Sequence, residues 1–446
     1  MRVPLGHREV PGIVWDGGSA ADPGVGLRPI GTALPALPPL DAAWRDLVDF
    51  AAAYYQRSTG EVALSVLPPE LRKLDDAQLA NRIQKLRKAL AGTPGSAPPK
   101  TAPPLTVDQQ AVLDRIAEVG TQAQPAPVLL HGVTGSGKTE VYLGAAARAL
   151  AAGRQALVLV PEINLTPQLE ARFAERFAGR HIVSLHSGLT PAQRLRSWLA
   201  AHLGLADLVL GTRLAVFASM PRLGLIVVDE EHDPSYKQQE GARYSARDLA
   251  VYRGRLEKAT VVLGSATPSL ESWQRAAEGK YLKLALPARI GGGALPTVRL
   301  VDMTQQPKLH GVNTALSAPL VAALQDRLAR GEQSLVFLNR RGYAPVLHCG
   351  ECGWKSGCPH CSAWRVFHKL DRTLRCHHCG FTERVPRACP SCGNPDIAPV
   401  GRGTERLEEH LAELFATVTR PDGSAVRIAR IDADSTKKQG ALESQL

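Results

Sequence analysis

Short, nearly continuous apolar runs recur along the central part of the chain, between residues 105 and 286. They are rich in β-branched residues and are separated by segments in which apolar residues recur at helical spacing. Strands that are covered on both faces show this pattern, because neither face meets water. The runs occupy residues 128–130, 156–160, 208–210, 225–228 and 261–263. The alternation of such strands with helices predicts a doubly wound α/β domain around a parallel sheet.

The segment before this domain has a different pattern. Residues 1–70 contain short β-like runs and a helix-like stretch over residues 41–55. Residues 71–90 place leucine and isoleucine near helical spacing with charges between them, which predicts a helix. Five prolines within residues 92–104 predict a linker and a domain boundary.

The segment after the central domain predicts a second α/β unit. We expect this unit to begin before the apolar run at residues 334–338. Eight cysteines interrupt it between residues 349 and 392, and helix-and-strand patterning resumes from residue 400.

A glycine-rich loop lies between the first predicted strand of the central domain and the helical run that follows it. The loop matches the pattern G-x-x-x-x-G-K-[ST] of phosphate-binding loops. In such loops glycines let backbone N–H groups close around phosphate oxygens at a helix N-terminus. We predict that Lys138 reaches the β- and γ-phosphates of ATP and that Thr139 is a ligand of Mg²⁺. The predicted nucleotide-binding residues of the loop are Gly132, Val133, Thr134, Gly135, Ser136, Gly137, Lys138 and Thr139.

The partner carboxylates come from a second strand end. The run at residues 225–228 leads directly into Asp229 and Glu230, so both lie at the carboxyl edge of a parallel sheet, where ligands bind. Acidic strand ends are common in ordinary turns, but beside a phosphate-binding loop they favour catalysis. We predict that Asp229 holds Mg²⁺ and that Glu230 polarises the attacking water, with Lys138 as the third catalytic residue.

The pattern Thr106-x-x-Gln109 has two interpretations that do not exclude each other. It is typical of a capping box that opens a helix at residue 107. Gln109 can also contact the adenine edge of a nucleotide.

All eight cysteines fall into four Cys-x-x-Cys pairs. Paired thiolates at this spacing form tetrahedral zinc sites, and four pairs within 44 residues make redox motifs or disulfides poor alternatives. Three groupings into two sites are possible. Only five residues separate Cys352 from Cys358, which is tight for two pairs around one ion, so spacing favours a nested arrangement with two structural Zn²⁺. The inner site would be Cys358, Cys361, Cys376 and Cys379, and the outer site Cys349, Cys352, Cys389 and Cys392.

The net charge of +11 suggests a polyanionic partner. Bound zinc would reduce this net charge, so the charge is weaker evidence than its size suggests. Eight thiolates with two zinc ions add a charge of −4, which leaves +7. Composition alone therefore favours nucleic-acid binding only weakly. No apolar run approaches the roughly 18 residues of a membrane span, and the charged, proline-containing start does not resemble a signal peptide. We expect a cytoplasmic protein without a membrane partner.

Several motifs together resemble the PriA family of superfamily 2 helicases. Residues 229–232 (Asp-Glu-Glu-His) and 264–269 (Gly-Ser-Ala-Thr-Pro-Ser) are similar to the acidic and coupling motifs of that superfamily. Residues 159–168, 186–188 and 211–213 resemble its DNA-contacting motifs. Residues 233–248 are similar to the aromatic-rich loop of PriA, and residues 337–343 and 403–405 also match that family. With the cysteine pairs, the resemblance covers about residues 105–446.

The resemblance implies an ATP-dependent 3′→5′ DNA helicase that recognises forked DNA and starts replication restart by assembling the primosome. It implies the same nested zinc pairing, and as partners single-stranded and forked DNA, primosome proteins and single-stranded-DNA-binding protein. In the aromatic-rich loop, stacking rings and phosphate-binding charges suit single strands; a solvated loop with two half-buried tyrosines is the alternative. The predicted DNA-contacting residues are Arg213, Tyr236, Lys237, Tyr244 and Arg247.

The family's domain plan gives expected boundaries. We expect a small β-rich remnant of the 3′-DNA-end-binding domain (1–72), a helix and proline-rich linker in place of a winged-helix domain (73–104), and a RecA-like first helicase lobe (105–290). A second lobe would start at 291–345, be interrupted by the zinc module (346–399) and continue over 400–446. Compared with the family, the chain resembles one truncated at both ends, without the arginine motif of the second lobe.

Two other functions fit the same residues. One is a DNA-binding fragment with little or no helicase activity, because the arginine motif is absent. The other is a zinc-containing ATPase that acts on RNA. ATP hydrolysis measured with forked DNA, duplex DNA and RNA separates the three.

Overall fold

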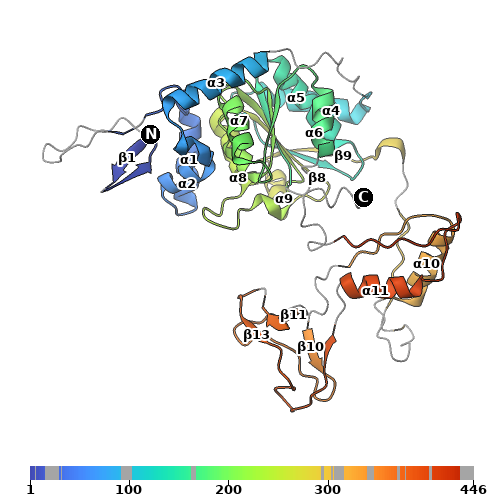
Figure 1. Ribbon diagram of the computed structural model, residues 1–446. Coiled ribbons are helices and arrows are strands. Elements are labelled where there is room, and N and C mark those ends of the chain that lie inside the picture. The colour runs from blue at the N-terminus through green and yellow to red at the C-terminus, as the bar shows by residue number, and fades with distance from the viewer. Residues whose placement is uncertain are drawn as a thin grey trace. The chain divides into compact units, whose positions relative to one another are not determined.

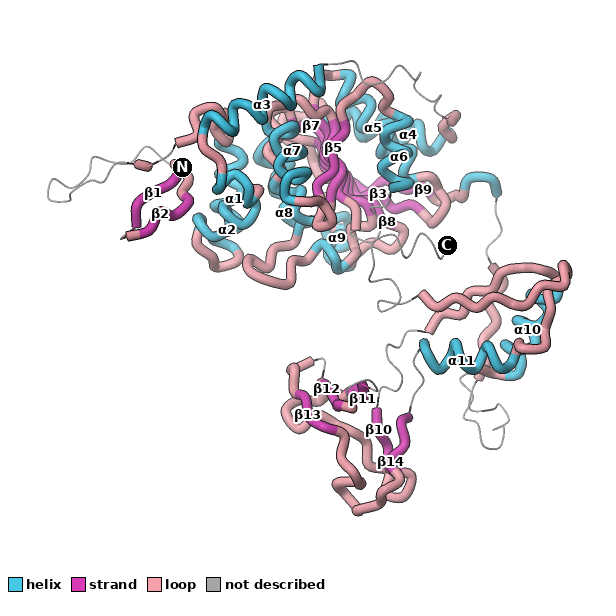
Figure 2. Tube along the Cα trace, viewed as in Figure 1, coloured by secondary structure: helices cyan, strands magenta, loops and turns pink. Residues whose placement is uncertain are grey.

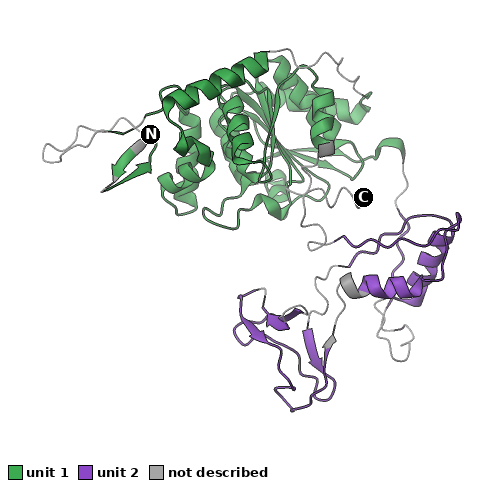
Figure 3. Ribbon diagram, viewed as in Figure 1, with its two compact units in different colours: residues 1–295 green, residues 296–446 purple. Residues whose placement is uncertain are grey.

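A computed structural model describes most of the chain (Figure 1). The described residues are 1–5, 7–15, 30–31, 33–91, 103–161, 167–292, 296–302, 305, 316–338, 346–368, 372–376, 378–400 and 404–431. They form two compact units, residues 1–295 and residues 296–446, which are described separately (Figure 3). In the described residues, no helix is long and apolar enough to cross a membrane.

A seven-stranded parallel sheet is the centre of the first unit (Figure 2). Its strand order is β5-β6-β4-β7-β8-β3-β9. The strands are β3 (Val128–Gly132), β4 (Gln155–Leu159), β5 (Ile182–Leu185), β6 (Leu208–Gly211), β7 (Leu223–Asp229), β8 (Thr260–Ser265) and β9 (Leu282–Leu286). The predicted doubly wound α/β fold is confirmed, and all five predicted strands are present.

Both faces of the sheet are covered by helices, which explains the continuous apolar runs. The helices α4 (Val107–Gly120), α5 (Lys138–Ala151) and α6 (Pro167–Arg176) pack on one face, with Leu130 and Val158 of the sheet in the same core. On the other face Leu129 and Leu157 share a core with α7 (Pro191–His202) and α8 (Ala246–Glu257). The short helix α9 (Leu270–Ala277) follows β8.

The N-terminal segment packs against this second face. A hairpin of β1 (Arg2–Leu5) and β2 (Arg8–Pro11) precedes three helices, α1 (Ala42–Tyr54), α2 (Thr59–Val66) and α3 (Asp76–Ala91). The buried Trp44 donates from its indole Nε1 to the carbonyl of Phe217, at 2.7 Å. His202 Nε2 lies 2.9 Å from the carbonyl of Pro38. The described part of this segment is therefore more helical than the β-rich remnant we expected, and its helices share one core with the sheet.

The predicted helix over residues 71–90 begins later than its pattern suggested. A 3₁₀ turn, Pro69–Lys73, comes first, and α3 starts at Asp76. Leu71 and Leu74 are buried as expected, but in the turn and just after it. A periodic pattern marks buried positions and does not by itself fix where a helix begins. The proline-rich residues 92–102 lie outside the described residues.

The second unit contains two antiparallel sheets and a small helical core. β10 (Val346–Cys349) pairs with β14 (Ile397–Val400), and β12 (Thr373–Arg375) pairs with both β11 (Val366–His368) and β13 (Thr382–Arg384). The helices α10 (Ala318–Ala329) and α11 (Thr404–Leu414) share a core. Its buried members are Leu316, Leu324, Leu407, Leu411 and Phe415.

The apolar run at residues 334–338, before which we expected the second α/β unit to begin, forms neither a helix nor a strand. Val336 and Leu338 pack against the helical core, while Leu335 and Phe337 are exposed by 89% and 81%. Buried and exposed side chains alternate along this run, as they do in a strand, but a strand also needs hydrogen-bonded neighbours. Among the described residues of this unit, none pairs with this segment. In this unit, two stretches within the motifs that resemble the PriA family, residues 339–343 and residue 403, lie outside the described residues. Residues 432–446 also lie outside them.

Candidate nucleotide and zinc sites

The glycine-rich loop connects β3 to α5 at the carboxyl edge of the sheet. Gly135 and Gly137 adopt left-handed φ angles of 82° and 76°, and Gly137 caps the helix that begins at Lys138. Glycine is required for close packing as well, because a Cβ atom at Gly132 would lie 2.6 Å from Ser136 Oγ. The loop therefore has the tight, helix-initiating shape that cradles phosphate.

Lys138 is nearly buried within this loop. Its ammonium donates to the carbonyl of Gly132 at 3.0 Å and lies 3.8 Å from a carboxylate oxygen of Glu230. Thr139 is the next residue of the helix and is half-buried. The structure thus brings together the lysine of one strand end and the carboxylate of another, as the two sequence motifs predicted.

Gln109 is a buried connection between α4 and the loop. It completes the predicted capping box, since its N–H donates to Thr106 Oγ1 and its Oε1 accepts from the N–H of Thr106. Its amide Nε2 also donates to the carbonyl of Ser136 at 3.0 Å. The capping box is confirmed, and the same side chain fixes the phosphate-binding loop. Contact with adenine stays a prediction.

Asp229 lies at the end of β7 and is held by a tyrosine of the loop helix. Tyr142 donates its hydroxyl to Asp229 Oδ1 at 2.9 Å. Burial raises the pKa of Asp229 above its ordinary value, although this hydrogen bond acts in the opposite direction. Tyr142 can reach the carboxylate because it passes beside Gly264, where a Cβ atom would lie 1.7 Å from its hydroxyl. Glycine in the motif after β8 therefore makes room for a contact within the nucleotide site.

Glu230 and His232 link the acidic motif to its surroundings. Glu230 has a left-handed φ of 44°, an unusual backbone for a non-glycine residue at the turn after β7. His232 Nδ1 lies 2.8 Å from Ser265 Oγ, which also accepts from the N–H of Thr267. The acidic turn is thus joined to the turn after β8.

Glu231 is the most heavily bonded carboxylate of this region, and sequence reasoning missed it. It is 1% exposed and accepts from the N–H of Ser269 (2.7 Å), the hydroxyl of Ser269 (3.0 Å) and the hydroxyl of Ser272 (2.8 Å). Arg247 lies 3.4 Å away. Glu231 stands between Glu230 and His232 in the acidic motif, which is the one hint that the sequence offers. The sequence alone does not show which carboxylate of the motif turns inward.

The two tyrosines of the aromatic-rich loop are buried, which corrects the expected stacking role. Tyr236 is 2% exposed, and its hydroxyl lies 2.6 Å from the carbonyl of Asp229 and 3.0 Å from that of Leu159. Tyr244 is 5% exposed and meets Phe217 edge-on. Burial raises the pKa of both hydroxyls. Neither ring offers a face to a base, because each serves as an anchor of the loop.

The cationic residues predicted to contact DNA differ in exposure. Lys237 is exposed, with its ammonium 5.0 Å from the centre of the Tyr55 ring. Arg213 is half-buried and donates to Gln238 Oε1 at 2.7 Å. Arg247 is held by Glu231 and by Ser269 Oγ at 2.8 Å, so it is part of the buried network.

The eight cysteines form two clusters of four. Within each cluster the sulfur atoms lie within 4.8 Å of one another. Facing sulfurs are 3.4–3.6 Å apart, far beyond a disulfide bond and near the roughly 3.8 Å spacing of thiolates around one tetrahedral zinc. The clusters are Cys349, Cys352, Cys389 and Cys392, and Cys358, Cys361, Cys376 and Cys379. The nested grouping is confirmed.

Local backbone geometry shapes the cysteine turns for metal binding. In three of the four turns a glycine follows the second cysteine with a φ of 73–79° and donates its N–H to the carbonyl of the first. These glycines are Gly353, Gly380 and Gly393. The donor set therefore fits two closed, structural Cys₄ zinc sites.

Comparison with known families agrees with these sites. The family model of the PriA 3′-DNA-binding domain matches residues 1–68, that of the DEAD/DEAH box helicases matches residues 106–276, and that of the PriA DNA helicase Cys-rich region matches residues 358–384. The replication restart protein PriA of Bacillus subtilis is 42% identical over 348 residues, which are 78% of this chain and 42% of that protein. That of Haemophilus influenzae is 47% identical over 318 residues, 71% of this chain and 42% of that protein.

A third relative covers the whole chain. PriA of Rickettsia felis is 35% identical over 448 residues, 100% of this chain and 64% of that protein. The chain belongs to the PriA family. It spans 42–64% of the length of these three relatives. The match of the family's Cys-rich region to residues 358–384 contains the inner cysteine cluster, and the helicase match contains every residue of the predicted nucleotide site.

Proposed function

We propose that this chain is the ATP-hydrolysing motor of a DNA helicase that moves 3′→5′, recognises forked DNA and starts replication restart by primosome assembly. The observation that carries the proposal is the meeting of two strand ends, where Lys138 Nζ lies 3.8 Å from Glu230 beside the half-buried Asp229. A lysine in a phosphate-binding loop facing an acidic pair is the arrangement that phosphoryl-transfer motors require.

The residues of the loop fit ATP and Mg²⁺. Tyr142 and the N–H of Glu230 both donate to Asp229 Oδ1, so Oδ2 remains for a cation, and Thr139 lies at the start of the same loop helix. A magnesium ion held by Thr139 and Asp229 would neutralise charge on the β- and γ-phosphates. The loop N–H groups and the Lys138 ammonium would bind the phosphate oxygens.

Glu230 is the proposed general base. As the water oxygen forms its bond to the γ-phosphorus, Glu230 takes a proton from that water, and the bond to the leaving ADP oxygen breaks. The backbone of Glu230 is fixed by its N–H bond to Asp229 Oδ1 at 3.0 Å. This bond therefore fixes the position of the proposed base, Glu230, relative to the proposed magnesium ligand, Asp229.

The aromatic-rich loop supplies the proposed link to DNA. Lys237 and Arg213 provide cationic contacts for a strand, and Tyr236 bonds the loop to the backbone of Asp229. Movement of the loop by DNA would thus reach the magnesium ligand through one hydrogen bond. Single-stranded and forked DNA are the proposed substrates, and the zinc module is proposed to contact primosome proteins and single-stranded-DNA-binding protein.

The test uses the chain with forked DNA carrying a free 3′ or 5′ arm, with duplex DNA and with RNA. ATP hydrolysis and strand displacement are measured for each polymer at one salt concentration. Greatest stimulation by forked DNA, with displacement in the 3′→5′ direction only, supports the proposal. Greater stimulation by RNA would identify an RNA-directed ATPase, and DNA binding without hydrolysis would identify a DNA-binding fragment.

A further inference from the structure

A closed turn, residues 237–245, forms the middle of the aromatic-rich loop. Its two ends, Lys237 and Ser245, face each other as an antiparallel bridge, and the N–H of Gln238 donates to the carbonyl of Tyr244 at 2.8 Å. Lys237 and Arg243 are exposed on this turn. The turn therefore presents cations to solvent at the place where we propose that a DNA strand binds.

One side chain of the N-terminal segment contacts both ends of this turn. The hydroxyl oxygen of Tyr55, the residue that caps the end of α1, accepts from the N–H of Ser245 at 3.0 Å. The ammonium of Lys237 lies 5.0 Å from the centre of the Tyr55 ring, within the range of a cation–π contact. Tyr55 thus holds the two ends of the turn together from a position 190 residues before Ser245 in the sequence.

Both ends of the turn lead directly to the acidic motif. Immediately before the turn, the hydroxyl of Tyr236 donates to the carbonyl of Asp229 at 2.6 Å. Two residues after the turn, Arg247 lies 3.4 Å from the buried carboxylate of Glu231. A displacement of the turn at its ends therefore acts on the backbone of the proposed magnesium ligand and on the ion pair of Glu231.

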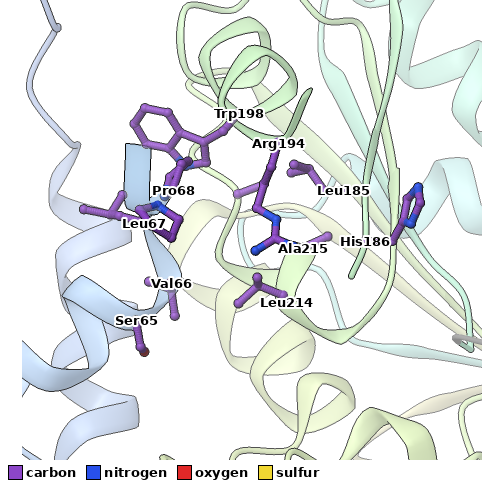
Figure 4. A pocket seen from close by; sticks show the side chains of 12 residues that line it. Ser65, Val66, Leu67, Pro68, Leu185, His186, Arg194, Trp198, Leu214 and Ala215 are labelled. Atoms are coloured by element: carbon purple, nitrogen blue, oxygen red, sulfur yellow. The ribbon is translucent and has the colours of Figure 1, made fainter. Parts of the chain in front are cut away.

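Tyr55 belongs to a segment that is fixed on the sheet domain. Phe50 of α1 stacks on Tyr252 of α8, with ring centres 3.7 Å apart and ring planes inclined by 16°. Farther along the chain, the residues at the end of α2 line a small cavity together with Leu185 and Leu214 of the sheet domain (Figure 4). The ring of Tyr55 therefore has a firm support against which the turn is held.

We propose that Tyr55 is a positioning residue through which the N-terminal segment holds the aromatic-rich loop in the conformation that couples DNA binding to ATP hydrolysis. The inference rests on the proposed function as a DNA-stimulated motor and adds a requirement to it. With the ends of the turn held together, a strand that contacts Lys237 acts on Tyr236 and Arg247. Without the Tyr55 hydroxyl the same strand moves the turn alone. The N-terminal segment thereby acts on the ATP site, in addition to any contact of its own with DNA.

The test removes a single oxygen atom. Tyr55→Phe keeps the ring and its contact with Lys237 but leaves the N–H of Ser245 without this acceptor. ATP turnover is measured without DNA and across a titration with oligothymidylate, and DNA affinity is measured by fluorescence anisotropy at the same salt concentration.

The expected result is a loss of stimulation alone. Maximal DNA-stimulated turnover should fall by about fivefold, the change that loss of one ordinary hydrogen bond produces in an equilibrium. Turnover without DNA and the DNA concentration for half-maximal stimulation should stay within about twofold of the parent, because the variant removes no group that contacts ATP or DNA.

The matched control is Tyr54→Phe. Tyr54 is the preceding residue, is 69% exposed, and its hydroxyl makes no hydrogen bond with the described residues. This variant should hydrolyse ATP as the parent does, with and without DNA. A second comparison combines Tyr55→Phe with Tyr236→Phe. Because both hydroxyls hold the same loop, the combined loss of stimulation should be smaller than the product of the two single losses.

The outcomes of these measurements are distinct. A fall in maximal stimulated turnover alone, with the two losses of stimulation not multiplying, supports the proposal. Turnover that falls in proportion with and without DNA would show a merely structural role, and Tyr55→Phe behaving like Tyr54→Phe would show none. Weaker DNA binding with parental turnover at saturating DNA would make Tyr55 a DNA contact. Each of these results, or losses that multiply, would overturn the proposal and leave the proposed function standing. A parent chain whose ATP turnover does not respond to DNA would overturn both.

Discussion

Removal of the Glu231 carboxylate should strongly destabilise the first unit. The side chain of Glu231 is completely buried, accepts three hydrogen bonds from Ser269 and Ser272, and pairs with Arg247. In Glu231→Ala the serine hydroxyls can turn to other acceptors and Arg247 keeps Asp248 at 2.8 Å, but the N–H of Ser269 loses its acceptor. One buried N–H left without an acceptor predicts a loss of about 1–3 kcal/mol in the free energy of unfolding.

The assay is urea unfolding followed by tryptophan fluorescence. Glu271→Gln is the matched control, because Glu271 also faces Arg247, at 3.9 Å, but is 75% exposed. It should leave the free energy of unfolding within about 0.5 kcal/mol of the parent. Glu231→Gln, which keeps the shape and loses the charge, should fall between the two. A loss below about 1 kcal/mol for Glu231→Ala would refute the view that this carboxylate holds the turn after β8 in place.

Three further predictions concern the zinc and nucleotide sites. Cys358→Ser should lose one of two zinc ions, measured by metal analysis under reducing conditions, and leave the outer cluster at least partly occupied; loss in the combination expected for sequential pairing would contradict the nested clusters. Lys138→Ala should lower ATP turnover by about 10²–10³-fold, and an unchanged rate would remove Lys138 from the site. Burial raises the pKa of Asp229 in the folded chain, so ionisation of this carboxyl group disfavours the fold. The stability that the protonated group contributes is complete at pH values below its ordinary pKa of 3.8, and it is lost as pH rises through the raised pKa. Asp229→Asn should therefore gain stability relative to the parent as pH rises from about 4, by urea midpoints, and a constant difference would contradict this.

The fold of the first unit could be predicted where burial is complete. Central strands such as residues 225–228 are covered on both faces, so their apolar runs are continuous. The strands β5 and β9 lie at the two edges of the sheet and were not predicted. β9 alternates partly exposed and exposed residues before Leu286, and β5 is mostly half-buried. Edge strands share their pattern with loops and exposed helices.

The site could be predicted where one local motif carries the chemistry. The glycine loop, the acidic pair and the cysteine pairs each have a spacing that fixes their geometry. The aromatic-rich loop does not, because the burial of Tyr236 also depends on its contact with the strand end at Leu159, 77 residues away along the chain. The inward direction of Glu231 likewise depends on Ser269 and Ser272, which follow another strand. Such contacts between strand ends depend on the packing of the whole sheet.

Glu230 is the residue proposed to activate the water that attacks ATP. The most direct measurement compares nucleotide binding and DNA-stimulated ATP turnover in the parent chain and in Glu230→Gln. The amide keeps the size of the side chain but cannot accept the proton, so ATP should bind with nearly parental affinity while turnover falls by about 10²-fold or more. Hydrolysis by Glu230→Gln at the parental rate would contradict the account.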